Sequence, residues 1–321
     1  MTTTTLTPLP SAAAAPAAHA APAAAARASA LPYHRLALAN PAHRWWKPLV
    51  TLAATALVYA AMFLLLVVVG AVVGLASPDT WDSLDAVLLD MNHPTGVLLG
   101  FGSVALLLPA TALGIRLAER RTLGTLGSVA GRLRWNRLGP ALGLAAILYA
   151  LILGVDLAVA AASGPIAPSV GAATWPIVAV ALLVVPFQCA AEEYVFRALP
   201  QQALGAWLKS PWWGILLPIP FFVVGHGYDP LGQASVGLFA LVAGILVWRT
   251  GGLEYAIGLH VINNVSGTLL VAVGLADGNA TATTLTSVLI LAGAEIVFTV
   301  LALRHHASVT ARERATGALA A

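Results

Sequence analysis

Residues 174–197 read TWPIVAVALLVVPFQCAAEEYVFR, an apolar run that ends in two adjacent carboxylates, Glu192 and Glu193. An ionisable group in a membrane-spanning segment is costly, and by default it marks a functional site. Residues four apart share one face of a helix, so we expect Glu193 to pair with Arg197 while Glu192 points roughly 100° away. The pattern therefore predicts one neutralised acid and one free acid.

The rest of the chain has the composition of a polytopic membrane protein. Of its 321 residues, 59% are hydrophobic and 9% are charged, and the mean hydropathy is +0.87. In soluble domains about a quarter of all residues are charged. About twenty apolar residues cross a bilayer. We predict an all-α fold, a bundle of about eight transmembrane helices over residues 49–76, 96–115, 140–163, 174–195, 212–226, 231–248, 253–274 and 282–303.

The fifth segment is short and contains Pro211, Pro218 and Pro220, which predicts a kinked or broken helix. Broken helices within a membrane usually border a cavity or a site. The predicted domain organisation is a disordered, Ala/Pro-rich cytosolic tail with a basic end over residues 1–47, a transmembrane domain over 48–304 with its motif core at 175–270, and a short cytosolic tail over 305–321.

The sixteen Lys and Arg residues are distributed unevenly between the two sides of this topology. With the N-terminus in the cytosol, all of them fall on the cytosolic side, as the positive-inside rule requires. The opposite loops carry no Lys or Arg, and their acidic residues are Asp79, Asp82, Asp85, Asp90, Asp229 and Asp277. We therefore expect an integral protein of the cell inner or plasma membrane with both termini cytosolic.

A few further polar residues lie within the predicted spans. His226 follows Phe222 by one turn, and His260 and Asn264 share one face of the seventh helix. Alone, each histidine is better explained by a bond to a backbone carbonyl, and Asn264 by contacts between helices. Together with Glu192 they supply what water attack on a carbonyl requires: a base, a second proton carrier and oxyanion donors.

The order and spacing of these residues resemble the CPBP (Abi) family of intramembrane proteases, which includes the type II CAAX prenyl endopeptidases and bacteriocin-processing enzymes. The resemblance covers about residues 175–270. Three motifs carry it: EExxxR at Glu192, Glu193 and Arg197, FxxxH at Phe222 and His226, and HxxxN at His260 and Asn264.

The resemblance implies an endopeptidase that cleaves membrane-associated or lipidated proteins and peptides. Glu192 would activate water alongside His226, and His260 with Asn264 would support the tetrahedral oxyanion. Glu193, Arg197 and Phe222 are then expected in supporting roles. The expected partners are a membrane-associated substrate and the lipid bilayer, with no nucleic acid.

Several alternatives stay open at this stage. Glu192, His226 and His260 could instead ligate a catalytic zinc ion, although HExxH is absent and we prefer a site without metal. A non-catalytic membrane scaffold or regulator, a bacteriocin self-immunity protein and a small-solute transporter are the other candidates. Substitution of Glu192 separates an enzyme from a scaffold.

The charge distribution generates a topology prediction. Reporter fusions after Arg121 and after Lys209 should both read as cytosolic, because only that orientation places all basic residues on one side. The measurement is paired alkaline phosphatase and fluorescent protein fusions at each position. An external reading at either position would contradict the predicted number of spans.

Overall fold

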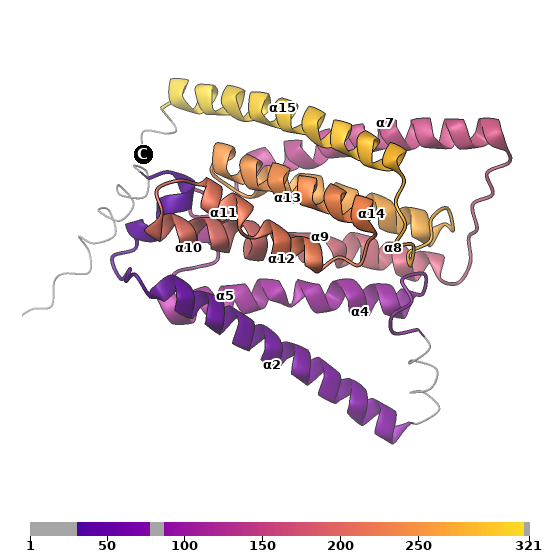
Figure 1. The fold of residues 1–321 in the computed structure, drawn as a ribbon, viewed down its shortest axis with the longest axis horizontal. Coiled ribbons are helices and arrows are strands. Elements are labelled where there is room, and N and C mark those ends of the chain that lie inside the picture. The colour runs from indigo at the N-terminus through magenta and orange to yellow at the C-terminus, as the bar shows by residue number, and fades with distance from the viewer. Residues whose placement is uncertain (1–30, 78–86, 318–321) are drawn as a thin grey trace, which may run out of the picture.

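A computed structural model describes residues 31–77 and 87–317, and in this part of the chain the regular structure is helical with no strand (Figure 1). In chain order the helices are η1 (Tyr33–Ala39), α2 (Lys47–Ala76), α4 (Pro94–Ala105), α5 (Leu107–Glu119), α6 (Gly124–Gly127), α7 (Trp135–Ser163), α8 (Thr174–Leu183), α9 (Val185–Glu193), η2 (Tyr194–Ala198), α10 (Leu199–Trp207), α11 (Trp212–Leu216), α12 (Ile219–Val224), α13 (Pro230–Thr250), α14 (Glu254–Ala272) and α15 (Leu285–Ala315).

Among the described residues, seven helical segments are long and apolar enough to cross a membrane, judged by length and composition. An eighth apolar segment, Trp212–Val224, is shorter. These findings confirm the predicted class, an all-α polytopic membrane protein. The seven segments are Lys47–Ala76, Pro94–Glu119, Trp135–Ala162, Thr174–Trp207, Pro230–Thr250, Glu254–Ala272 and Leu285–Ala315.

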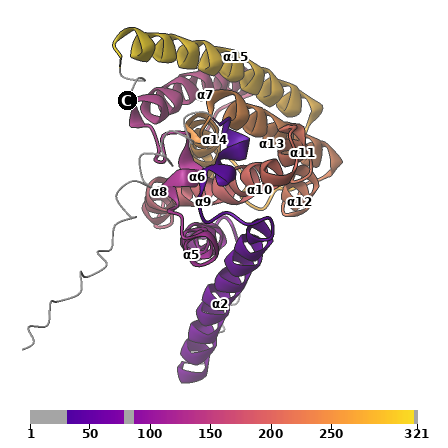
Figure 2. The same ribbon diagram turned by 90° about the vertical axis from the view of Figure 1, so that its left-hand side faces the viewer.

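The helices run lengthwise through one bundle, with α14 near its centre (Figures 1 and 2). Helix α14 packs against α7, α8, α9 and α13. Helices α15 and α7 cover one side, whereas α2 packs on α5 and diverges from the bundle along its length. The motif residues of α9 and α14 therefore lie in the interior of the bundle.

The fifth segment is broken, as its prolines predict. Helix α11 ends at Leu216, and α12 begins at Ile219 after Pro218, which cannot donate the backbone hydrogen bond that a continuous helix needs. Helix α12 is only six residues long and ends at Val224. His226 therefore lies in the connection that leads to α13.

The fourth segment is longer than predicted and changes its winding at the EExxxR motif. Residues Tyr194–Ala198 form a π turn, in which the Leu199 N–H donates to the Tyr194 carbonyl five residues earlier. Pro200 follows directly and has no N–H for the Phe196 carbonyl. The helical path continues to Trp207, and Arg197 is buried inside the bundle, not at the end of the span where the sequence predicted it.

Two predicted tails also differ from the structure. Residues 33–39 are not disordered: Tyr33 is buried, and its hydroxyl donates to the Leu126 carbonyl at 2.5 Å. Helix α15 continues past the predicted boundary at residue 304 and ends at Ala315, where Glu313 pairs with Arg137 at 2.7 Å. The predicted disorder of the first thirty residues lies outside the described part of the chain.

A buried ion pair fixes the start of α14, six residues before His260. Glu254 is fully buried and accepts from the Arg134 backbone N–H and Nε at 2.8 Å and from its Nη2 at 2.7 Å. Three bonds satisfy both oxygens of a carboxylate that would otherwise be costly to bury. The orientation of α14 against the start of α7 is thus set by charge as well as by packing.

The crossing of α14 and α7 generates the second prediction. A Cβ on Gly258 would lie 2.7 Å from the Ala141 Cβ and 3.0 Å from its backbone carbon, so Gly258→Val must push the two helices apart. Overpacking of this kind costs about 1–3 kcal/mol, and we expect a lower melting temperature in detergent. Gly143→Val is the matched control, because a Cβ there meets nothing within 4 Å. Equal melting temperatures would contradict the close approach.

Candidate active site

The Glu193 carboxylate joins two helices at the centre of the site. Its Oε1 atom lies 2.8 Å from His260 Nδ1 on α14 and 3.2 Å from Arg197 Nη1 on its own helical segment. Glu193 is 0% exposed and Arg197 is 2% exposed. The Glu193–Arg197 ion pair is present as the four-residue spacing predicts, and Glu193 also orients His260.

This contact determines how His260 presents its second nitrogen. An ionised carboxylate only accepts hydrogen bonds, so the neutral His260 ring carries its hydrogen on Nδ1 and its lone pair on Nε2. Nε2 lies 3.5 Å from Glu192 Oε2 and 3.3 Å from Asn264 Nδ2. Glu192 Oε2 is buried and has no hydrogen-bond partner among the described residues.

A chain of carboxamides holds Asn264. Its Nδ2 donates to Gln188 Oε1 at 3.1 Å, and its Oδ1 accepts from Asn263 Nδ2 at 2.9 Å. Asn263 in turn accepts from the Tyr149 hydroxyl at 2.8 Å. Our reading of the sequence did not single out Gln188 in this site. The signal was present, because Gln188 precedes Glu192 by four residues and therefore shares its helix face.

His226 is fixed through its other nitrogen. Its Nδ1 lies 2.8 Å from the Phe222 carbonyl, which can only accept, so the neutral ring carries its lone pair on Nε2. The His226 carbonyl accepts from Gln233 Nε2 at 2.8 Å, which ties the connection to the start of α13. The four-residue spacing of the FxxxH motif thus allows a local hydrogen bond between the His226 ring and the Phe222 carbonyl.

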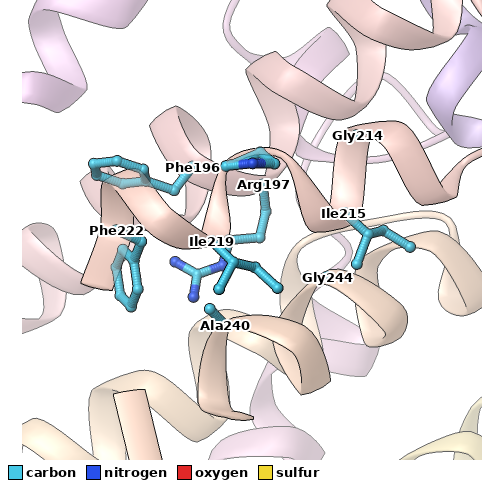
Figure 3. Close-up of a pocket in the computed structure, with 9 residues that line it drawn as sticks. Phe196, Arg197, Gly214, Ile215, Ile219, Phe222, Ala240 and Gly244 are labelled. Atoms are coloured by element: carbon cyan, nitrogen blue, oxygen red, sulfur yellow. The ribbon is translucent and has the colours of Figure 1, made fainter. Parts of the chain in front are cut away.

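Phe222 also contacts the Arg197 guanidinium. The Arg197 Cζ atom lies 4.0 Å from the centre of the Phe222 ring and 5.3 Å from that of Phe239. Figure 3 shows the guanidinium reaching towards the Phe222 ring beside Ile219. Aromatic faces stabilise a cation that has left water. The EExxxR and FxxxH motifs are therefore physically linked.

One cavity of about 730 Å³ brings the predicted site residues together. Glu192, His226, His260 and Asn264 all line it, and Phe222 contributes to its wall. Glu193 and Arg197 are not among the lining residues and lie behind His260 and Phe222. Further lining residues that sequence reasoning missed or set aside are Gln188, Asn263, Thr268 and Glu295.

Two loops meet at the far end of this cavity through a reciprocal pair of Asp-x-Asn turns. Asn92 Nδ2 donates to Asp277 Oδ1, and Asn279 Nδ2 donates to Asp90 Oδ1, both at 2.7 Å. The Asn92 carboxamide and the Asn279 backbone N–H hold the pKa of Asp277 below its ordinary value. A Cβ on Gly278 would collide with the Met91 carbonyl oxygen, so the loops approach too closely for a larger residue.

No group of three or more His, Cys, Asp and Glu side chains lies close enough to hold a metal ion in the described ranges. The zinc set considered from the sequence, Glu192, His226 and His260, shares the cavity without forming such a group. We therefore derive no catalytic step through a metal.

Comparison with known proteins bears on the same region. Residues 173–266 match the family model described as type II CAAX prenyl endopeptidase Rce1-like. The predicted resemblance is confirmed. The matched segment, residues 173–266, contains all three motifs.

A relative also matches, the uncharacterized protein YyaK of Bacillus subtilis (strain 168), which is 26% identical over 166 residues. The match covers 49% of this chain and 55% of the relative, so the chain spans about half the length of that protein. No solved structure matches.

The buried pair generates the third prediction. Arg197→Ala leaves the Glu193 carboxylate buried without its cation, which costs about 3–5 kcal/mol, so the yield of folded protein and its melting temperature should fall. Arg116→Ala on the exposed surface of α5 is the matched control and should behave as wild type. A fully stable but inactive Arg197→Ala variant would instead assign this arginine to the reaction itself.

Proposed function

We propose that this protein is an intramembrane endopeptidase in which Glu192 is the general base. This proposal rests on the Glu192 Oε2 atom, which is buried, has no hydrogen-bond partner in the described part of the chain, and lies 3.5 Å from His260 Nε2 in the cavity. Two acceptors at this distance favour a donor between them, such as a water molecule or a shared proton. The family match supports peptide-bond hydrolysis as the reaction.

In the proposed reaction, Glu192 takes a proton from water and the hydroxide oxygen forms a bond to the scissile carbonyl carbon. The electron pair of the carbonyl moves onto its oxygen. Asn264 Nδ2 donates to this oxyanion, and His260 does so when Nε2 is protonated and Glu193 stabilises the resulting imidazolium. Collapse of the intermediate breaks the carbon–nitrogen bond.

The leaving amine needs one proton, and two groups are available for it. Glu192 holds the proton that came from water and returns it directly or through His226. In the neutral His226 ring, Nε2 is an acceptor because Nδ1 donates to the Phe222 carbonyl. His226 therefore accepts a proton at Nε2 and passes it to the amine, and the reaction leaves both residues unchanged.

The fourth prediction tests the base. Glu192→Gln keeps the volume and removes the proton acceptor, so cleavage should fall at least about 100-fold while the melting temperature stays close to that of the wild type. The assay is a quenched fluorescent peptide library with purified protein in detergent. Asp156→Asn, on an exposed site of α7, is the matched control and should keep full activity. Full activity of the Glu192→Gln variant would contradict the proposal that Glu192 is the general base. An unchanged phenotype in cells that carry an inactive Glu192→Gln variant would favour a scaffold.

The fifth prediction concerns metal. Cleavage should survive exhaustive chelation and dialysis, because the proposed steps use only side chains of this chain. Elemental analysis of the active protein should then show no stoichiometric zinc. Loss of activity on chelation and recovery with added zinc would replace the general-base mechanism with a metal-assisted one.

A further inference from the structure

The cavity extends from Glu192 and His260 towards one end of the bundle. Met91 and residues 276–281 line it, and they belong to the loops before α4 and after α14. Tyr228 and Thr283, which flank the start of α13 and precede α15, also line it. These loops lie together at one end of the bundle (Figure 1). The mouth of the cavity is therefore at this loop end.

The opposite side of the catalytic residues is filled with buried groups. Arg197 is packed against Phe222, and beneath it only about 10 Å³ of space remains (Figure 3). Gln201 is 0% exposed and donates to the Gly244 carbonyl at 2.9 Å. Neither Arg197 nor Gln201 lines the large cavity. In the described part of the chain, the large cavity therefore stops short of the α10 end.

The basic residues mark that closed end as cytosolic. In the described residues, Lys and Arg cluster at the end of α5, the start of α7, the connection after α10 and the last turns of α13 and α15. These positions share one end of the bundle because successive spans alternate in direction (Figure 1). Positive residues face the cytosol. The mouth of the cavity consequently faces the non-cytosolic side.

The lining chemistry indicates which part of a substrate is accepted. Glu192, Asp277 and Glu295 line the cavity, and none of its described lining residues is Lys or Arg. Glu295 is 4% exposed, and its Oε2 has no hydrogen-bond partner among the described residues. A carboxylate in this position accepts from a peptide N–H, and a protonated acid donates to a peptide carbonyl, so either form binds a peptide backbone. A free terminal carboxylate of a substrate would instead face Glu192 and Asp277, with no Lys or Arg among the described lining residues to neutralise it.

We propose that the enzyme takes an internal segment of a protein or peptide that lies on the non-cytosolic side of the membrane, not the free carboxyl terminus of a cytosolic lipidated protein. The part of this inference that concerns the substrate rests on the proposed function, because it requires the protein to be an endopeptidase. The direction of access rests only on the position of the cavity and on the charges. The two parts therefore have separate tests.

Thiol labelling tests the direction of access without any catalysis. Single cysteines are introduced in a Cys189→Ala background at Thr281 near the mouth, at Ser235 within the cavity and at Ala311 near the end of α15. With a membrane-impermeant maleimide on intact cells, T281C and S235C should be labelled. A311C should be labelled only after permeabilisation, and it serves as the matched control.

Two labelling results would overturn the direction of access. If S235C reacts only after permeabilisation, the cavity opens to the cytosol. If it reacts under neither condition while T281C does, no aqueous path leads from the mouth to the site. Melting temperatures of the three variants establish that each one is folded.

Paired peptides test the accepted substrate. Two quenched fluorescent peptides of one sequence, cleaved by the wild type, carry either a C-terminal amide or a free carboxylate near the scissile bond. The amide should be cleaved at least about tenfold faster, which corresponds to 1.4 kcal/mol. Equal or faster cleavage of the carboxylate would overturn the inference. Cleavage of neither peptide in any sequence would overturn the proposed function, while the labelling result would still stand.

Discussion

The site depends on one buried carboxylate, Glu193, that serves two partners on different helices. Its ion pair with Arg197 removes the cost of burying either charge alone, and its bond to His260 Nδ1 ties α9 to α14. Without Glu193 the imidazole of His260 would be free to rotate or change tautomer. A buried acid that orients a histidine in this way is also found in the Ser-His-Asp triad of serine proteases.

Two local helical irregularities lie next to these contacts. The π turn over Tyr194–Ala198 changes the angular position of Arg197 relative to a regular helix, and the break at Pro218 shortens α12 so that His226 enters the cavity from a loop. π turns inside helices are frequent at functional sites. Gly258 lets α14 lie directly against α7, and Glu254 fixes its start. Backbone geometry and charge therefore position the same imidazole.

Much of the fold could be predicted because a bilayer makes apolar length a strong signal. Seven spans and the short, proline-broken segment follow from hydropathy and from Pro218 alone. The packing of η1 could not be predicted from composition, because it depends on a single hydroxyl bond from Tyr33 to a carbonyl 93 residues away. The length of the fourth helical path was also missed, because the apolar run ends at the glutamates while the helix continues through buried Gln201 and Gln202.

The sequence predicted the contacts within single helices of the candidate site but not the contacts between helices. Spacing within a helix places Glu193 with Arg197, His260 with Asn264 and Phe222 with His226. Contacts between helices, such as Glu193 with His260 and Asn263 with Tyr149, require the three-dimensional arrangement. Gln188 lay within reach of spacing arguments, but a neutral carboxamide beside two acids carries a weak signal.

The depths of the two histidines give the site a direction. His260 lies six residues into α14, towards the end of the bundle where the described Lys and Arg residues gather, whereas His226 follows the last residues of α12 near the opposite loops. At about 1.5 Å per residue these positions differ along the bundle axis, and a cavity of about 730 Å³ connects them. His226 therefore stands on the mouth side of Glu192, and the His260–Glu193 pair stands on the closed side. In the proposed reaction, a peptide that enters from the mouth passes His226 before its carbonyl reaches Asn264, so the proposed proton carrier comes before the proposed oxyanion donors along its path.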